Sequence, residues 1–229
     1  MKTHPRTGNH VRLAMVAGIV CLPLVVVAGE HKDGKMNQGW QKMQGSVTGA
    51  ENLLTGEVTD GFNPLGNVRE LVLSENLERV HYVIYEVPFP YSFYGSEDGF
   101  VDYTNVALER GYGTRPDLRI DDPQSQRAPE ELKLTKKEAE HRLASNVMDS
   151  SLNFTSENSS REVEDLLVDR KSGAITHFVI EMDPESLFNE NARAIPAGEV
   201  KVGKDGKLTT AMKFDAIDDM QRYNPEFLK

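Results

Sequence analysis

One pattern of apolar positions occurs twice in this chain of 229 residues. Residues 68–87 (VRELVLSENLERVHYVIYEV) align without a gap on residues 163–182 (VEDLLVDRKSGAITHFVIEM), and nine aligned positions are apolar in both segments. Shorter matches lie on either side: residues 50–54 correspond to 144–148, 101–106 to 195–200, and 129–132 to 225–228. The offset stays between 94 and 96 in all four blocks, which indicates an internal duplication. The chain is therefore expected to build one small module twice.

Each copy has the pattern of short β-strands. Its apolar runs are rich in Val, Ile, Leu and aromatic residues, and turn residues separate them at spacings of about 8–12, which is typical of a small barrel or sandwich. In the second copy, residues 163–168 and 175–182 flank a loop that ends in Gly173. An Asp205-Gly206 turn then separates two alternating segments, which is a strong hairpin signal. Asp215 is expected to cap a short helix that ends near Tyr223.

One helix is predicted between the two copies. Residues 135–138 (TKKE) have the sequence of a capping box, in which a hydroxyl and a carboxylate satisfy opposite backbone amides. We interpret residues 133–144 as a linker helix. The predicted organisation is a signal peptide (1–28), a flexible leader (29–49), a first module (50–132), the linker helix (133–144) and a second module (145–229).

The first 28 residues have the layout of a secretory signal. Its positive charges come from Lys2, Arg6 and Arg12, with no acidic residue among them. An apolar run follows over residues 13–28 (LAMVAGIVCLPLVVVA), and a small residue, Gly29, comes next. This run is interrupted by Pro23 and is shorter than the roughly 20 residues that span a bilayer as a helix. We therefore expect export, with cleavage near Ala28.

Cleavage would change the chemistry of the chain that remains. The only cysteine, Cys21, lies inside the signal, so the mature chain could form no disulfide and would depend on its core for stability. The formal net charge is −10 for the whole chain, and loss of three basic residues makes it −13. A surface this negative repels phosphate backbones, so no nucleic-acid partner is expected.

The features of the second copy follow a recognisable order. An apolar strand ends in Asp169, a turn closes on Gly173, and residues 175–182 form the next strand. Later come residues 194–200 (AIPAGEV), residues 206–208 (GKL) and Pro225. In this order of features the copy resembles the PRC-barrel family.

The first copy is similar to the same family but departs from its pattern at two places. It has Asp102-Tyr103 where the second copy has Pro196-Ala197, and it has Glu78 where the second copy has Gly173. Together the two copies extend the resemblance over residues 50–132 and 144–228, which is nearly the whole mature chain.

The resemblance implies a mainly β fold class, with two tandem small β-barrels joined by a short helix. In the family, the module is known from the H subunit of the photosynthetic reaction centre and from a ribosome-maturation factor. It acts there in interaction and assembly rather than as an enzyme. The resemblance therefore implies no catalytic residue and no cofactor. It also favours a bacterial source, and hence a periplasmic or secreted mature protein.

Motifs for catalysis or metal binding are missing from the sequence. It has no nucleophile elbow, phosphate-binding loop, paired-histidine motif or cysteine cluster. The histidines of the mature chain are scattered at positions 31, 81, 141 and 177. The sequence therefore predicts no enzyme, no metal site and no cofactor site.

The two copies differ most in one loop. Residues 88–94 (PFPYSFY) of the first copy are aromatic, whereas residues 183–189 (DPESLFN) at the corresponding place are acidic. Aromatic side chains are enriched at recognition surfaces. The candidate residues for binding a protein partner are accordingly Phe89, Tyr91, Phe93 and Tyr94. The alternative is that this loop folds over an open barrel end and completes the core.

Three functions follow from these observations. The first is an exported, non-enzymatic interaction or assembly module that binds a protein partner. The second is a membrane-tethered assembly subunit with the layout of the reaction-centre H subunit, which requires that residues 13–28 stay uncleaved and would supply the only membrane contact. The third is a hydrolase or metal-binding protein, which would need a pocket that gathers several carboxylates with shifted pKa values.

Overall fold

The computed structural model describes residue 43 and residues 45–87, 97–111, 115–120, 140–182, 191–220 and 222–225. The predicted signal peptide, most of the leader, the aromatic loop and residues 133–139 of the predicted linker helix lie outside these ranges. The described part is mainly β, as the sequence predicts. Its helices are all too short or too polar to cross a membrane.

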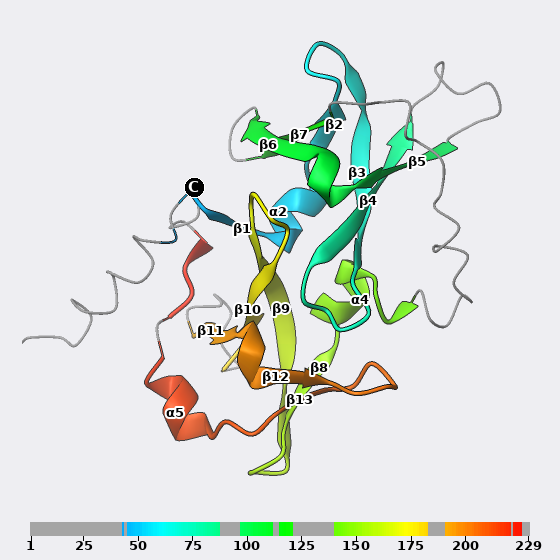
Figure 1. Ribbon diagram of the computed structural model, residues 1–229. Coiled ribbons are helices and arrows are strands. Elements are labelled where there is room, and N and C mark those ends of the chain that lie inside the picture. The colour runs from blue at the N-terminus through cyan, green and yellow to red at the C-terminus, as the bar shows by residue number, and fades with distance from the viewer. Residues whose placement is uncertain are drawn as a thin grey trace, which may run out of the picture.

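The first half of the molecule is a sheet of six strands. They are β2 (Glu57–Thr59), β3 (Pro64–Leu73), β4 (Val80–Val87), β5 (Glu97–Asp102), β6 (Val106–Arg110) and β7 (Pro116–Ile120). Their order in the sheet is β5-β4-β3-β2-β7-β6, and the only parallel pair is β2 with β7. Helix α2 (Ala50–Leu54) precedes the sheet, and a 3-10 turn, η1 (Tyr103–Asn105), joins β5 to β6. The sheet curls into a half-barrel (Figure 1).

The second half repeats this arrangement strand for strand. Its strands are β8 (Ser151–Phe154), β9 (Ser159–Asp169), β10 (Ile175–Ile180), β11 (Arg193–Pro196), β12 (Val200–Val202) and β13 (Leu208–Thr210). Their order is β11-β10-β9-β8-β13-β12, again with one parallel pair, β8 with β13. Helix α4 (Ala144–Met148) stands where α2 stands in the first half, and the 3-10 turn η4 (Ala197–Glu199) stands where η1 does. The repeat in the sequence is thus also a repeat in topology.

Two elements of the second half have no counterpart among the described residues of the first half. Strand β1 (Val47–Gly49) adds to it by pairing with β9, and helix α5 (Phe214–Asp218) follows β13. The prediction that Asp215 caps this helix is wrong, because the helix begins after Lys213 and Asp215 lies in its first turn. The helix also ends before Tyr223, whose amide donates to the Ala192 carbonyl at 2.9 Å and draws the chain towards β11.

The continuous apolar run in β9 has a simple cause. Leu166 and Val168 face the main core, whereas Leu167 between them faces a smaller cluster with Val47 and Val179. All three leucine and valine side chains of this run are therefore buried, although they point alternately to opposite faces of the sheet. Burial on both faces produces an apolar run in place of the alternation seen in strands with one solvated face.

The two halves meet through contacts that occur in pairs. The Val80 amide donates to the Gly173 carbonyl at 2.8 Å, and the Ile175 amide donates to the Glu78 carbonyl at 2.7 Å. Val80 and Ile175 are equivalent positions of the two copies, and so are Glu78 and Gly173. Each of these hydrogen bonds is therefore the other one with the two halves exchanged. The turn between β3 and β4 is thus joined to the turn between β9 and β10 by an antiparallel bridge between Arg79 and Ala174, which are themselves equivalent positions.

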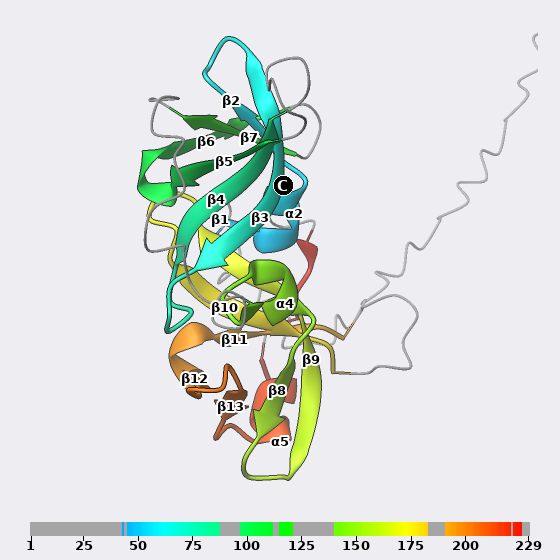
Figure 2. The ribbon, with the colours of Figure 1, turned by 90° about the vertical axis from the view of Figure 1, so that its right-hand side faces the viewer.

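The helices between the sheets follow the same exchange. The amide of Glu51 in α2 donates to Asp165 of the second half at 3.1 Å, and the amide of Ser145 in α4 donates to Glu70 of the first half at 3.3 Å. Figure 2 shows both helices in the middle of the molecule, between the two sheets. Contacts that interchange in this way are the pattern of an interface with approximate twofold symmetry.

One hydrophobic core runs through both halves. It includes Leu71 and Val83 from the first sheet and Leu166 and Phe178 from the second, together with buried residues of α2 and α4. Leu143, which was expected to lie in the linker helix, instead forms a bridge to Val72 before α4 begins. The two repeats therefore stabilise each other by burying a common apolar surface.

Candidate functional site

A groove lies between the two halves, beside strand β12. Its apolar part has a volume of about 620 Å³. Six of its lining residues are apolar: Leu77, Ile175 and Phe178, which are buried in the core, and Ala197, Val200 and Val202, which are half-buried. A polar part of about 720 Å³ adjoins it, since both parts are lined by Asn76 and Val202. We call the two parts together the β12 groove.

The first wall of the groove is the turn between β3 and β4, residues 74–79. The hydroxyl of Ser74 accepts hydrogen bonds from the amides of Glu78 and Arg79, at 3.0 and 3.2 Å. Leu77 adopts a left-handed backbone conformation (φ 55°) and is buried. Few non-glycine residues adopt such a conformation, which is unfavourable by itself. The hydrogen bonds to Ser74 and the burial of Leu77 stabilise it here.

The opposite wall is the hairpin of β12 and β13. Its turn closes through the Gly203 amide, which donates to the Lys207 carbonyl at 2.8 Å, and the Lys207 amide donates to Asp205 at 3.2 Å. Gly206 has a φ of +77°, a conformation that glycine adopts at no steric cost. This confirms the hairpin that the Asp205-Gly206 pair predicts.

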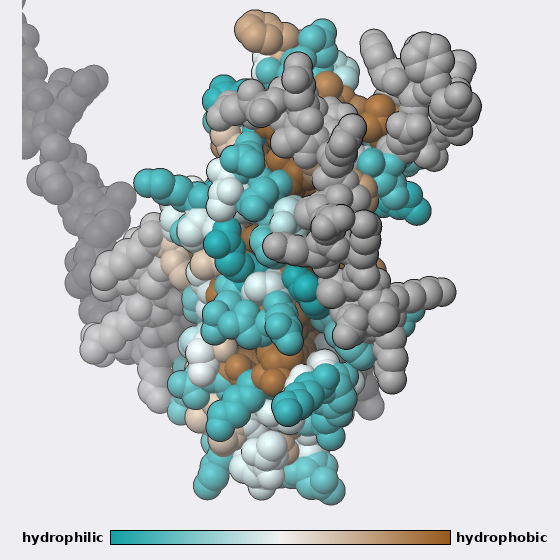
Figure 3. Space-filling view, turned by 45° about the vertical axis from the view of Figure 1, so that its right-hand side comes forward, coloured by the Kyte–Doolittle hydropathy of each residue, from teal (hydrophilic) through white to brown (hydrophobic). Residues whose placement is uncertain are grey.

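Strand β12 lies at the end of the strand order, so its outer edge has no strand partner within the described ranges. The turn η4 beside it is open: no heavy atom lies within 4 Å of the position that a Cβ at Gly198 would occupy. Figure 3 shows a hydrophobic area ringed by hydrophilic residues at the level that β12 has in Figure 1. The groove thus brings apolar side chains next to a strand edge that pairs with no strand of the described ranges, and a site for an extended peptide uses both of these elements.

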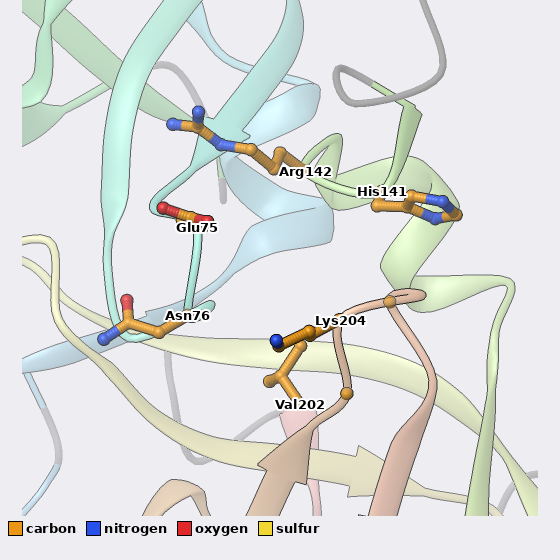
Figure 4. A pocket seen from close by; sticks show the side chains of 8 residues that line it. Glu75, Asn76, His141, Arg142, Val202 and Lys204 are labelled. Atoms are coloured by element: carbon orange, nitrogen blue, oxygen red, sulfur yellow. The ribbon is translucent and has the colours of Figure 1, made fainter.

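The polar part of the groove carries charges on both walls. Glu75 lies on the turn of the first half, and Lys204 on the hairpin of the second half extends across the gap towards Asn76 (Figure 4). Arg142 is engaged in the fold, since its Nε donates to the Leu73 carbonyl at 2.7 Å. Lys201 and Lys204 line the β12 side of the groove, whereas Glu75 and Glu78 line the opposite side.

Sequence reasoning did not find a cluster of acidic residues beside α2. The carboxylate of Asp165 is buried and accepts from the amides of Glu51 and Leu166 and from the hydroxyl of Tyr223. Burial raises its pKa to about 6. Burial, together with the nearby charges of Glu181, Glu162 and others, raises the pKa of Glu164 to about 7. Because the carboxylate of Asp165 accepts hydrogen bonds from α2 and from Tyr223, we interpret this cluster as part of the interface between the halves.

These two acids predict a pH dependence of stability. Both pKa values are higher in the folded protein than in the unfolded chain, so the stability they contribute is complete below about pH 4 and is lost as the pH rises through 6 to 7. Asp165→Asn, which keeps the shape but carries no charge, should remove the part due to Asp165. From pH 4 to pH 8, the free energy of unfolding of the variant should rise by about 2–3 kcal/mol relative to that of the wild type. Urea denaturation at a series of pH values measures this, and a difference independent of pH would contradict it.

A second hollow, of about 460 Å³, lies at the other side of the second half. Arg193, which is almost fully buried, donates to Asp218 at 3.1 Å and to the carbonyls of Asn191 and Ala192. Arg161 stacks over the ring of Phe214 with its guanidinium carbon 4.6 Å from the ring centre. These contacts join α5 to β9 and β11, so the arginines have a structural role.

The residues that the sequence nominates for binding are not placed. Phe89, Tyr91, Phe93 and Tyr94 lie outside the described residues. No group of three or more histidine, cysteine or acidic side chains that could hold a metal ion occurs in the described part of the chain. Three of the groove residues, Ala197, Gly198 and Val200, fall in the segment 194–200 (AIPAGEV), which the sequence marked only as a feature of the family resemblance.

Comparisons with known proteins add no family to this description. No protein-family model matches the chain, and no curated protein matches it either. The resemblance to the PRC-barrel family therefore stays a prediction.

Proposed function

We propose that this protein is an exported, non-enzymatic interaction or assembly module that binds a protein partner in the β12 groove. The observation that carries the proposal is a groove with apolar side chains beside the edge of β12, which pairs with no strand of the described ranges. Exposed sheet edges pair readily with other chains, and proteins use this in recognition by adding a partner's strand to the sheet. The groove supplies side-chain contacts and the edge supplies backbone hydrogen bonds.

In this proposal each half is a PRC-barrel-like domain. Its support is the shared strand order of the two curled sheets, together with the sequence features that resemble the family. The family's role in assembly agrees with a site made of a sheet edge and an apolar groove. The proposal extends to a periplasmic or secreted location, for which the support is the signal-like N-terminal sequence.

Crosslinking in cells tests whether the protein has a partner at all. Cells of the source organism that produce the tagged full chain are treated with a lysine-reactive crosslinker, and crosslinked peptides are identified by mass spectrometry. We expect one recurrent partner protein, joined mainly through Lys201 or Lys204. Crosslinks only within the chain or to abundant bystanders would contradict an interaction function.

The N-terminus of the purified protein tests export. If the protein is exported as proposed, the chain recovered from the cell envelope or medium begins at Gly29 or Glu30, because the signal ends in small residues there. Intact-mass measurement and N-terminal sequencing of protein purified through a C-terminal tag give the answer. A chain that keeps residues 13–28 and stays with the membrane fraction would favour the membrane-tethered alternative.

A further inference from the structure

The two halves treat one pair of equivalent positions in opposite ways. In the first half, η1 begins with Tyr103, whose side chain is fully buried against the turn of the second half. The ring lies directly over Gly173: a Cβ at that position would be 2.5 Å from Cδ1 of Tyr103. An aromatic ring from one half thus covers a glycine of the other, and this side of the interface is closed.

On the equivalent side of the interface, both residues of this contact are replaced by other residue types. Ala197 begins η4 where Tyr103 begins η1, and Glu78 stands where the other turn has Gly173. Ala197 and Glu78 both line the apolar part of the β12 groove, together with Leu77 and Phe178. The groove therefore lies at the place that corresponds to the ring of Tyr103 in the first half.

We propose that the β12 groove binds an extended segment of a partner protein that places an aromatic side chain over Ala197 and an acidic side chain beside Lys201. This inference rests on the proposed function and names the partner's chemistry. The first half supplies the argument for the aromatic residue, since it shows how such a ring fills the equivalent place in this fold. Burying a side chain of this kind removes about 150–250 Å² from water and makes it a strong anchor.

The argument for an extended, acidic segment comes from β12. A strand added to its free edge would continue the second sheet and would run along the groove, which continues the interface between the halves. Lys201 lies at the centre of this strand, between Val200 and Val202. Opposite charges on neighbouring strands attract each other, and Lys204 at the end of the hairpin adds a second cation. An acidic residue next to the aromatic anchor therefore complements this side of the groove.

Selection of peptides on the folded chain tests the inference. Phage that display random twelve-residue peptides are selected on the mature chain and on the variant Ala197→Tyr with Glu78→Gly, which rebuilds the closed contact of the first half. We expect the peptides enriched on the wild type to share an aromatic and an acidic residue, and to bind the variant at least ten times more weakly. The variant should melt at the same temperature or higher, which shows that its fold is kept.

A second variant, Lys201→Glu, checks the charge. Peptides selected on it should carry a basic residue in place of the acidic one and keep the aromatic residue. Enriched peptides without an aromatic residue, peptides that bind the double variant equally well, or no enrichment over the double variant would each overturn the inference. A partner that crosslinks in cells and is unaffected by the double variant would also overturn it while the interaction function stands, whereas absence of any partner would remove the proposed function itself.

Discussion

Replacing Tyr103 with alanine should lower the free energy of unfolding by about 3–5 kcal/mol, the range for removing a large aromatic side chain from a core. The ring is fully buried and lies at the contact between the halves, against Gly173. Its loss would leave a cavity that neither sheet can close alone, because the turns on both sides are held by their own hydrogen bonds. Chemical denaturation of the purified protein measures the change.

Tyr103→Phe is the matched control for this variant. The hydroxyl of Tyr103 is buried and has no hydrogen-bond partner within the described structure. Burial of this kind also raises the pKa of the phenol. Removing the hydroxyl should therefore leave stability unchanged or raise it by up to about 1 kcal/mol. A loss as large as that of the alanine variant would show that the hydroxyl, and not the ring, holds the contact.

Replacing Gly173 with alanine should cost about 2–5 kcal/mol for two separate reasons. Gly173 has a φ of +73°, which is unfavourable for residues with a side chain by roughly 1–2 kcal/mol. The new Cβ would also overlap the ring of Tyr103, and forcing an extra atom into a packed core costs about 1–3 kcal/mol. The free energy of unfolding again measures the sum.

The double variant separates the two causes. In a chain that already carries Tyr103→Ala, the overlap is gone, so Gly173→Ala should cost only the backbone part, about 1–2 kcal/mol. Equal costs of Gly173→Ala in both backgrounds would mean that the ring and the glycine do not press on each other. Such a result would remove the closed contact on which the comparison of the two halves depends.

The strands could be predicted from the sequence because their signals are local. Alternation and turn residues identify the hairpin of β12 and β13, and the aligned apolar positions of residues 68–87 and 163–182 identify β3, β4, β9 and β10. The constant offset also indicates that the two halves share one topology. Failure occurred where a distant contact decides the structure. Asp215 is not a cap, because the amide of Phe214 at the start of α5 is bound by the distant Glu157.

The candidate groove could not be predicted for a related reason. The sequence does show Tyr103 opposite Ala197 and Glu78 opposite Gly173, as departures of one copy from the other. No local pattern in the sequence predicts that residue 103 contacts residue 173, or that residues 197 and 78 line the same groove. That knowledge requires the twofold exchange of the halves, which brings residues far apart in the sequence together.

The central claim is that the two halves share one fold and differ in function, with the groove beside β12 as the binding site. Site-specific photocrosslinking in cells tests it most directly. A benzophenone amino acid is placed either at Lys201 in β12 or at Ala107, the equivalent position in β6, in the half where the ring of Tyr103 covers Gly173. The account predicts a crosslinked partner from position 201 and none from position 107. Equal crosslinking from both positions, or crosslinking from position 107 alone, would contradict it.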